Sequence, residues 1–297
     1  MGYIPPFFWH YFFFRYNVCR GHKTAGRAGC PRRFSMKILI SPAKKMKVID
    51  DHPFTLTTPV FQQDFQELDR TLAGLSFADL CRTAKASEKV MGPVYQNLQH
   101  RKTHPDAIIL TPALLAYDGI AFTNMAPGVF ESDQWDYVQK HLRILSGAYG
   151  VLRPLDGIVS YRLEMQSRIP FSLYEYWNSR IADTFEEDEL LINLASEEYA
   201  KVIRPYHPLL DIQFLEQAAD GSCKEKGVYV KIARGTMVRW MAQNQVESVE
   251  ELKAFQELGY HLCNEKSTPD CLVFVRKEED IPKYKTRRAP ARTKKKA

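Results

Sequence analysis

The centre of the chain carries arginine and acidic side chains at a spacing that suits either ion pairing or anion binding. Residues 141–165 contain the stretch HLRILSGAYGVLRPLD followed by YRLEM. An arginine between apolar neighbours either extends its charged end to water or is held by a buried acid. The candidate pairs are Arg153 with Asp156 and Arg162 with Glu164. Two interpretations stay open: a structural ion-pair network, or a rigid set of guanidinium groups facing a cleft that binds phosphate or carboxylate.

Motifs with a fixed catalytic or metal-binding spacing are absent from the sequence. There is no G-x-x-x-x-G-K-[ST] phosphate loop, dinucleotide fingerprint, G-x-S-x-G elbow or H-E-x-x-H pair. His100 and His104 stand four residues apart, but the Lys, Thr and Pro around them favour a solvated helix end over a metal site. His261, Cys263 and Cys271 are interpreted as a packed thiol pair rather than a zinc site. We therefore expect no metal site and no cofactor.

The composition is that of an ordinary globular protein. The 297 residues are 45% hydrophobic and 26% charged, which excludes wholesale disorder, collagen and coiled coil. No apolar stretch approaches the roughly eighteen residues of a membrane-spanning helix, so we expect no membrane association. The six cysteines are scattered without a C-x-x-C pair. Reduced thiols and a cytoplasmic location are therefore expected.

The net charge of +6 comes from the two ends of the chain. Residues 1–35 and 283–297 hold 14 of the 41 Lys and Arg residues and no acidic residue. Residues 36–282 therefore carry 27 basic against 35 acidic side chains. Any nucleic-acid binding by this central region must rest on a local patch of positive charge.

Both ends are expected to lie outside the folded domain. Residues 1–35 place an aromatic run before a basic stretch, which is the reverse of a signal peptide. We interpret Met36 as the natural start and residues 1–35 as a non-native or disordered extension. Residues 283–297 are expected to form a disordered basic tail. Because no Gly/Ser-rich linker divides residues 36–282, they are predicted to form one domain.

The elements that must position the central arginines alternate between short apolar runs and amphipathic stretches. Apolar runs predict strands at residues 38–41, 119–122, 144–149, 190–194, 228–232 and 271–275. Helical spacing and capping residues predict helices at residues 62–72, 77–84, 88–98, 107–115, 133–142, 173–177, 197–203, 236–243 and 248–257. The predicted fold class is mixed α/β, a single compact domain with short buried strands surrounded by helices.

Seven motifs, in chain order, carry a resemblance to a known family. They are ISPAK at 40–44, HLRILSGAYGVLRPLD at 141–156, YRLEM at 161–165, LYEYW at 173–177, INLASEEY at 192–199, KIARG at 231–235 and LVF at 272–274. Together they resemble the YaaA family of bacterial peroxide-stress-response proteins, from Met36 to about Arg276. The resemblance implies a cytosolic protein that lowers damage from hydrogen peroxide, partly by limiting free intracellular iron. It also implies a family-specific α/β fold with a basic cleft and a helix-hairpin-helix-like element that binds DNA.

The region that matches the helix-hairpin-helix-like element is residues 77–98, a helix followed by a short turn and a second helix. Such a hairpin presents backbone N–H groups and a helix N-terminus to a phosphate. Arg82, Lys85 and Lys89 would supply positive charge. The turn lacks the usual G-x-G, and a Gly-Pro pair falls inside the second helix. Two packed helices with a solvated lysine face are the alternative.

The implied basic cleft is assigned to cations within or beside strand-like runs, where a side chain emerges at a cleft rim. These residues are Lys44, Arg153, Arg162, Lys231 and Arg234, with Arg143 of the central motif added to the predicted nucleic-acid interface. The expected partner is double-stranded DNA, bound electrostatically and without sequence preference. We expect no obligate protein partner.

An enzyme acting on a nucleotide, a nucleobase or damaged DNA in the same cleft is the alternative function. Its polar groups would be Tyr161, Glu164, Asn193 and Ser196. A neighbouring arginine favours the charged form of a carboxylate, so Glu164 is a poor general acid unless it is buried. No cluster of His, Cys and carboxylate residues has metal-ligand spacing. An effect on iron would therefore be indirect.

Overall fold

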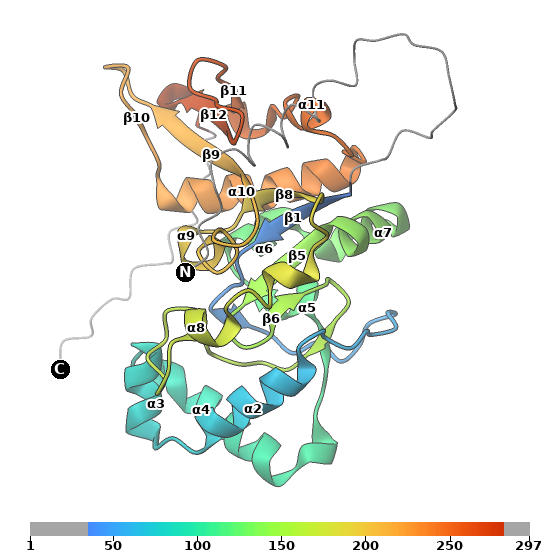
Figure 1. Cartoon of the computed structure of the whole chain (residues 1–297), viewed down its shortest axis with the longest axis vertical. Helices are drawn as coiled ribbons and strands as arrows, with labels where there is room; N and C mark the ends of the chain where they lie inside the picture. Colours follow the sequence, from blue (N-terminus) through green and yellow to red (C-terminus); the bar gives the residue numbers. More distant parts are fainter. Residues whose placement is uncertain (1–34, 282–297) are drawn as a thin grey trace, which may run out of the picture.

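The computed structural model describes residues 35–281 (Figure 1). The predictions for residues 1–34 and 282–297 lie outside the described residues. Within the described part, the α-helices are α2 (Gln62–Ala73), α3 (Phe77–Ala84), α4 (Glu88–Thr103), α5 (Ala113–Ala116), α6 (Ile120–Met125), α7 (Ser132–His141), α8 (Leu173–Trp177), α9 (Glu197–Ala200), α10 (Gly227–Gln243) and α11 (Val249–Leu252).

One eight-stranded sheet forms the centre of the described part. Its strand order is β11-β12-β9-β8-β1-β5-β6, and β10 pairs with β9. These strands are β1 (Met36–Ile40), β5 (Leu142–Ser146), β6 (Gly150–Leu152), β8 (Leu190–Leu194), β9 (Leu210–Gln217), β10 (Cys223–Lys224), β11 (His261–Leu262) and β12 (Cys271–Lys277). Two small sheets pair β2 (Lys45–Met46) with β4 (Tyr117–Asp118), and β3 (Thr111–Pro112) with β7 (Gly157–Ile158). The predicted mixed α/β class is confirmed.

Five neighbouring strands of the main sheet run parallel. They lie in the order β5-β1-β8-β9-β12. The chain passes from β1 to β5 on one side and then returns to β8 on the other side of β1. The strand order therefore reverses between β1 and β8. In open α/β sheets of this kind, ligands bind in the crevice at the carboxyl ends of the strands that flank such a reversal.

Strands β1 and β8 are buried because their sequences, MKILI and LLINL, are almost wholly apolar. A strand in the middle of a parallel sheet is covered on both faces, which selects continuous apolar runs rather than alternation. Lys37, the one partly exposed residue of β1, pairs with Glu189 at 2.6 Å. These two strands therefore form a rigid support for the loops that follow them.

Helix α10 packs directly against α6 (Figure 1). A Cβ at Gly235 would lie only 1.9 Å from the carbonyl oxygen of Ala121, so no larger residue fits at this position. The buried face of α10 includes Val230, Ala233, Met237 and Met241. The contact with α6 fixes where the exposed face of α10 lies.

Helices α2, α3 and α4 form a separate group at the end of the molecule opposite to β11 and β12 (Figure 1). The two helices predicted within residues 77–98, joined by a short turn, are present as α3 and α4, and α4 continues to Thr103. Pro93 lies inside α4, and Phe77 packs on Tyr95 with ring centroids 5.4 Å apart. Lys85, in the turn, has a left-handed backbone with φ of 47°.

Two predicted strands are wrong because their residues are helical. Residues 228–232 belong to α10, and residues 120–122 begin α6. Val228, Val230 and Ile232 favour strands locally, but packing of α10 on α6 outweighs this preference.

Other differences concern the length or presence of elements. The predicted helix at 107–115 is reduced to α5, because Thr111 and Pro112 pair with β7. Helices α9 and α11 are shorter than predicted. Strand β9 is absent from the predicted strands, although every second residue in it is buried, which is the period of a strand.

Candidate functional site

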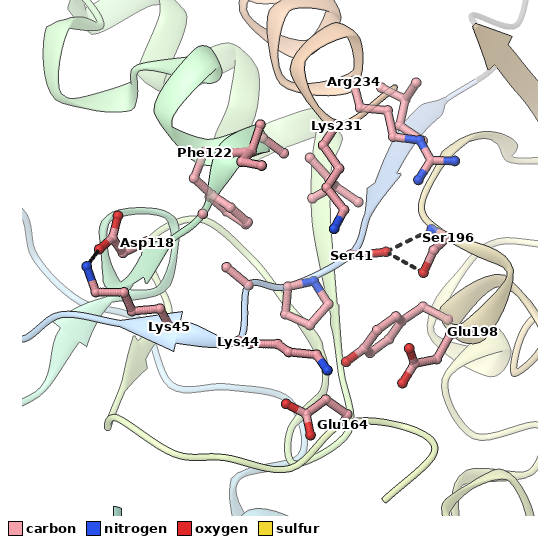
Figure 2. Close-up of a pocket in the computed structure, with 18 of the residues that line it drawn as sticks. Ser41, Lys44, Lys45, Asp118, Phe122, Glu164, Ser196, Glu198, Lys231 and Arg234 are labelled. Carbon is pink, nitrogen blue, oxygen red and sulfur yellow. Dashed lines mark hydrogen bonds and ion pairs between the residues drawn. The ribbon is translucent and has the colours of Figure 1, made fainter. Parts of the chain in front are cut away.

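A cavity of about 390 Å³ lies where the strand order reverses (Figure 2). It is lined by the residues after β1 and β8, by the start of α6, by residues 161–164 and by α10. The cationic residues of its wall are Lys44, Lys45, Arg162, Lys231 and Arg234, and the acidic ones are Asp118, Glu164 and Glu198. The volume falls within the range of about 300–1,000 Å³ that is typical of small-molecule sites.

Two serines join the ends of β1 and β8 at the base of the cavity. Ser41 Oγ accepts a hydrogen bond from the Ser196 backbone N–H at 2.8 Å and donates to Ser196 Oγ at 3.1 Å (Figure 2). Asn193 fixes the turn before Ser196, because its Oδ1 accepts from the Ala195 N–H at 3.0 Å and its amide donates to Asp211 at 2.7 Å. The two strand ends are therefore held together by hydrogen bonds.

Helix α10 supplies two cations to one side of the cavity. Lys231 and Arg234 are three residues apart, so they lie on one face of the helix, and both extend toward Ser41 and Ser196 (Figure 2). Arg234 Nε is buried and has no hydrogen-bond partner within residues 35–281. Burial lowers the pKa of Arg234, but a guanidinium stays charged at neutral pH. This side of the cavity is thus positively charged and open to an anion.

The other side of the cavity carries mixed charge. Lys44 extends toward Glu164 (Figure 2), and Lys45 forms an ion pair with Asp118. Glu164 pairs with Arg162 at 2.5 Å, as the sequence predicts, and Arg162 also donates to the carbonyl oxygen of Lys44 at 3.2 Å. These contacts tie residues 161–164 to the loop after β1.

Residues 161–165 are held against the β5–β6 hairpin by a close backbone approach. A Cβ at Gly147 would lie 2.6 Å from the carbonyl oxygen of Leu163, so glycine is required there. Tyr161 is buried, and its hydroxyl shares hydrogen bonds of 2.7 Å with Ser146 and Tyr117. Burial raises the pKa of Tyr161 to about 12, so this hydroxyl is protonated at neutral pH.

The predicted cleft cations separate into two groups. Lys44, Arg162, Lys231 and Arg234 line the cavity. Arg153 does not line it: Arg153 pairs with the fully buried Asp156 at 3.0 Å, the second predicted ion pair, and donates to the Thr58 carbonyl.

Arg143 also lies outside the cavity wall. It donates to the carbonyl oxygens of Gln139 and Leu142, and burial lowers its pKa. Arg153 thus fits the ion-pair interpretation of the central motif. Arg143 fits neither interpretation, because it donates to backbone carbonyl oxygens, whereas Arg162 both pairs with an acid and faces the cavity.

The hairpin cations lie on the α3–α4 group. Arg82 pairs with Asp79, while Lys85 and Lys89 are exposed and form no ion pair within residues 35–281. Thr83 Oγ1 donates to the carbonyl oxygen of Arg168 at 3.1 Å, which joins the hairpin to the segment that follows residues 161–164 of the cavity wall.

Of the predicted catalytic candidates, Tyr161, Glu164 and Ser196 line the cavity, whereas Asn193 holds the neighbouring turn instead. Five polar lining residues are absent from the predicted set: Ser41, Lys45, Asp118, Glu198 and Tyr199. The sequence contains a signal that could have identified Ser41 as a site residue, because Ser41 directly follows a buried strand and precedes Pro42. Its pairing with Ser196 depends on strand order, which local sequence does not encode.

No group of three or more His, Cys, Asp or Glu residues is placed to hold a metal ion within residues 35–281. No helix among these residues is both long and apolar enough to cross a membrane.

Comparison with known proteins identifies the family. A family model described as "Peroxide stress protein YaaA" matches residues 36–266. A UPF0246 protein of Agathobacter rectalis is 42% identical over 251 residues, covering 82% of this chain and 99% of the relative. A UPF0246 protein of Desulfitobacterium hafniense is 41% identical, covering 81% and 98%, and one of Pediococcus pentosaceus is 39% identical, covering 82% and 99%. The chain therefore belongs to the YaaA family of peroxide stress proteins, as its motifs indicate.

Proposed function

We propose that this protein acts in the cytoplasm during hydrogen peroxide stress, by binding double-stranded DNA without sequence preference and so lowering damage linked to intracellular iron. The observation that carries the proposal is the gathering of Lys44, Arg162, Lys231 and Arg234, from three segments of the chain, around one cavity. The name of the matching family, peroxide stress protein, supports the role in stress.

A local cationic surface can bind DNA although residues 36–282 carry more acidic than basic side chains. Lys44 and Lys231 are exposed and make no ion pair within the described residues, so their charge is available to a phosphate. Contacts to phosphate carry no sequence information, which accounts for binding without sequence preference. The proposal assigns no residue to iron, and the protection from iron-linked damage follows from the bound DNA.

The α3–α4 hairpin provides a second contact with DNA in this proposal. Lys85 and Lys89 are exposed near its turn, and Thr83 connects the hairpin to the segment that carries Glu164. Two cationic surfaces joined by one segment can contact phosphates at separate points of a duplex.

An enzyme that acts on a nucleotide, a nucleobase or damaged DNA is the second candidate, favoured by the carboxylates of Glu164 and Glu198 in the same cavity. A positioned carboxylate can take up a proton from a reacting group. Loss of turnover in Glu164→Gln, with binding retained, would support this function over simple DNA binding.

Fluorescence anisotropy of labelled duplex DNA at several salt concentrations tests the DNA-binding proposal. We compare the full chain with residues 36–282, because 14 cations lie outside this range and such cations can bind DNA phosphates without any contribution from the cavity. The variants are Lys231→Gln with Arg234→Gln, Lys85→Gln with Lys89→Gln, and Arg239→Gln as a control on α10 that does not line the cavity.

We expect residues 36–282 to bind DNA with an affinity that falls steeply with salt. Each double variant should lower the slope of log affinity against log salt by about two, since each lost phosphate contact contributes about one. Arg239→Gln should leave the slope unchanged. Binding by the full chain alone would contradict the proposal and assign the affinity to the ends of the chain.

A further inference from the structure

The two cations of α10, like Lys44, lack the acidic partner that Arg162 and Lys45 have among the described residues. Arg162 pairs with Glu164, and Lys45 pairs with Asp118. Lys231 and Arg234 form no ion pair within residues 35–281, and the Arg234 Nε is buried without a hydrogen bond. A buried charge without a partner is costly. Lys231 is exposed, and the carboxylates of Glu225 and Asp211 act on Arg234 without forming an ion pair with it. The face of α10 that looks into the cavity therefore carries two cations without an ion-pair partner among the described residues.

The serine pair adds hydrogen-bond donors to this end of the cavity. The Ser196 hydroxyl oxygen accepts a hydrogen bond from the Ser41 hydroxyl, so its own O–H can donate to a ligand. Figure 2 shows Lys231, Arg234, Ser41 and Ser196 converging from α10 and from the two strand ends. Two cations and a hydroxyl donor around one space suit a phosphate, and guanidinium binds phosphate through two parallel hydrogen bonds.

The opposite end of the cavity suits a different part of the ligand. Glu164 and Glu198 lie there, across from α10 (Figure 2). Arg162 and Lys44 balance the charge on this side, which therefore attracts phosphate less than the α10 side does. Its carboxylates accept hydrogen bonds, so they can bind hydroxyl and amino groups. The cavity therefore has a phosphate end and an acceptor end, and this polarity orients a ligand that has a phosphate at one end and donors at the other.

Charge and size together specify the type of phosphate. A phosphomonoester carries about two negative charges at neutral pH, which matches Lys231 with Arg234, whereas an internal diester of DNA carries one. A cavity of about 390 Å³ has the volume of a small-molecule site and is bordered by several segments of the chain. A single terminal nucleotide can enter it, whereas a continuous duplex can contact only the exposed cations at its rim, such as Lys44 and Lys231.

We propose that the cavity binds the phosphomonoester of a nucleoside, with the phosphate between Lys231, Arg234 and Ser196 and the sugar or base toward Glu164 and Glu198. The source is either a 5′-phosphorylated DNA end or a free mononucleotide. For a DNA end as the source, this inference rests on the proposed DNA-binding function. For a free mononucleotide, it is independent of that function. The cavity then recognises a DNA end, while Lys85 and Lys89 of the hairpin hold the adjoining duplex.

The test uses the full chain and a short DNA duplex labelled away from the end, carrying either a 5′-phosphate or a 5′-hydroxyl. The basic ends of the protein are unchanged in the variants, so the part of the preference that the double variant removes is assigned to the cavity. Calorimetric titration with deoxyadenosine 5′-monophosphate, and with deoxyadenosine as its matched control, tests the second source. The variants are Lys231→Gln with Arg234→Gln, and Arg239→Gln as the control, with thermal midpoints measured to verify folding.

We expect one of the two phosphorylated probes to bind about tenfold more tightly than its unphosphorylated counterpart, because two charge-assisted contacts are gained. The double variant should remove this preference, while Arg239→Gln keeps it. Equal binding of the phosphorylated and unphosphorylated members of each probe pair by the native chain would overturn the inference. If the chain still bound DNA in that case, the proposed function would stand. Binding of the mononucleotide without any DNA binding would support the inference and contradict the proposed function. If the folded double variant kept the preference for the phosphorylated probe, that result would also overturn the inference.

Discussion

Arg276 and Glu216 form an ion pair that is buried almost completely between β9 and β12. The two residues are register partners in the sheet, their side chains are 2% and 0% exposed, and their charged groups are 3.1 Å apart. The Tyr260 hydroxyl donates to the same carboxylate oxygen, and the Arg276 guanidinium lies 4.4 Å from the Tyr260 ring centroid and 4.8 Å from that of Tyr229. Glu216 Oε2 and Arg276 Nε are buried without a hydrogen-bond partner within the described residues, so the pair depends on the contacts just given.

At the residue scale, we predict that breaking this pair is far more costly than replacing it. Arg276→Met should lower the free energy of unfolding by about 3–5 kcal/mol, because Glu216 is left charged and buried. The double change Arg276→Met with Glu216→Leu should recover most of that loss. Urea denaturation measures both values. A single variant as stable as the double variant would show that Glu216 finds another partner or is hydrated.

At the element scale, the position of the cavity wall depends on how closely α10 approaches α6. Gly235 leaves no space for a methyl group beside Ala121, whereas a Cβ at Gly227, at the start of the same helix, meets no atom within 4 Å. The packing therefore requires glycine at position 235 but not at position 227. Lys231 and Arg234 occupy the stretch between them, so their placement depends on the packing at Gly235.

We predict that Gly235→Ala destabilises the protein by about 1–3 kcal/mol or more, through overpacking. Gly227→Ala should be neutral or stabilising by up to about 1 kcal/mol, because alanine favours the helix. Thermal denaturation compares the two, and titration with the phosphorylated probe checks whether Gly235→Ala also weakens binding. Equal effects of the two substitutions would contradict the tight packing of α10 on α6.

At the scale of the whole molecule, buried tyrosines connect segments that are far apart in the sequence. Tyr117 of β4, Tyr149 after β5 and Tyr161 meet in one cluster, where Tyr149 stacks on Phe65 of α2 with ring centroids 4.0 Å apart. Burial raises the pKa of each of these tyrosines above the ordinary value of 10, and it also raises that of Tyr199. Their hydroxyls stay protonated as long as the fold is intact.

The direction of these shifts predicts alkaline unfolding. Because the folded pKa values are higher than the unfolded value, the stabilising contribution is complete below pH 10 and is lost as pH rises above it. The buried tyrosines should ionise together with loss of circular dichroism, whereas in denaturant all tyrosines should titrate near pH 10. Ultraviolet absorbance of tyrosinate measures both titrations. Gradual ionisation with an intact circular dichroism spectrum would contradict the buried cluster.

Local pattern was sufficient where an element is specified by its own residues. The helices α2, α3 and α7 and the strands β1 and β8 begin and end near their predicted residues, since amphipathic period, capping residues and continuous apolar runs act within a few residues. The pairs Arg153–Asp156 and Arg162–Glu164 were predictable for the same reason, because each joins residues two or three positions apart.

Local pattern failed where a neighbour in space decides the conformation. Residues 228–232 favour a strand by residue type, but they form helix because α10 packs on α6 through Gly235. Arg143, Arg153 and Arg162 all lie within residues 141–165, and their residue type alone did not show which of them faces the cavity. Only Arg162 faces the cavity. Arg143 instead donates to the carbonyl oxygens of Gln139 and Leu142, and Arg153 pairs with Asp156.

The sequence by itself determined the α/β class, the central elements, the local ion pairs and the family, because these depend on residue order alone. Tertiary structure decided where the site lies. The order β5-β1-β8-β9-β12 brings Ser41 and Ser196, 155 positions apart, to one edge of the sheet and sets α10 across from them. Strand order follows from the packing of whole layers, and no local run of residues contains that information.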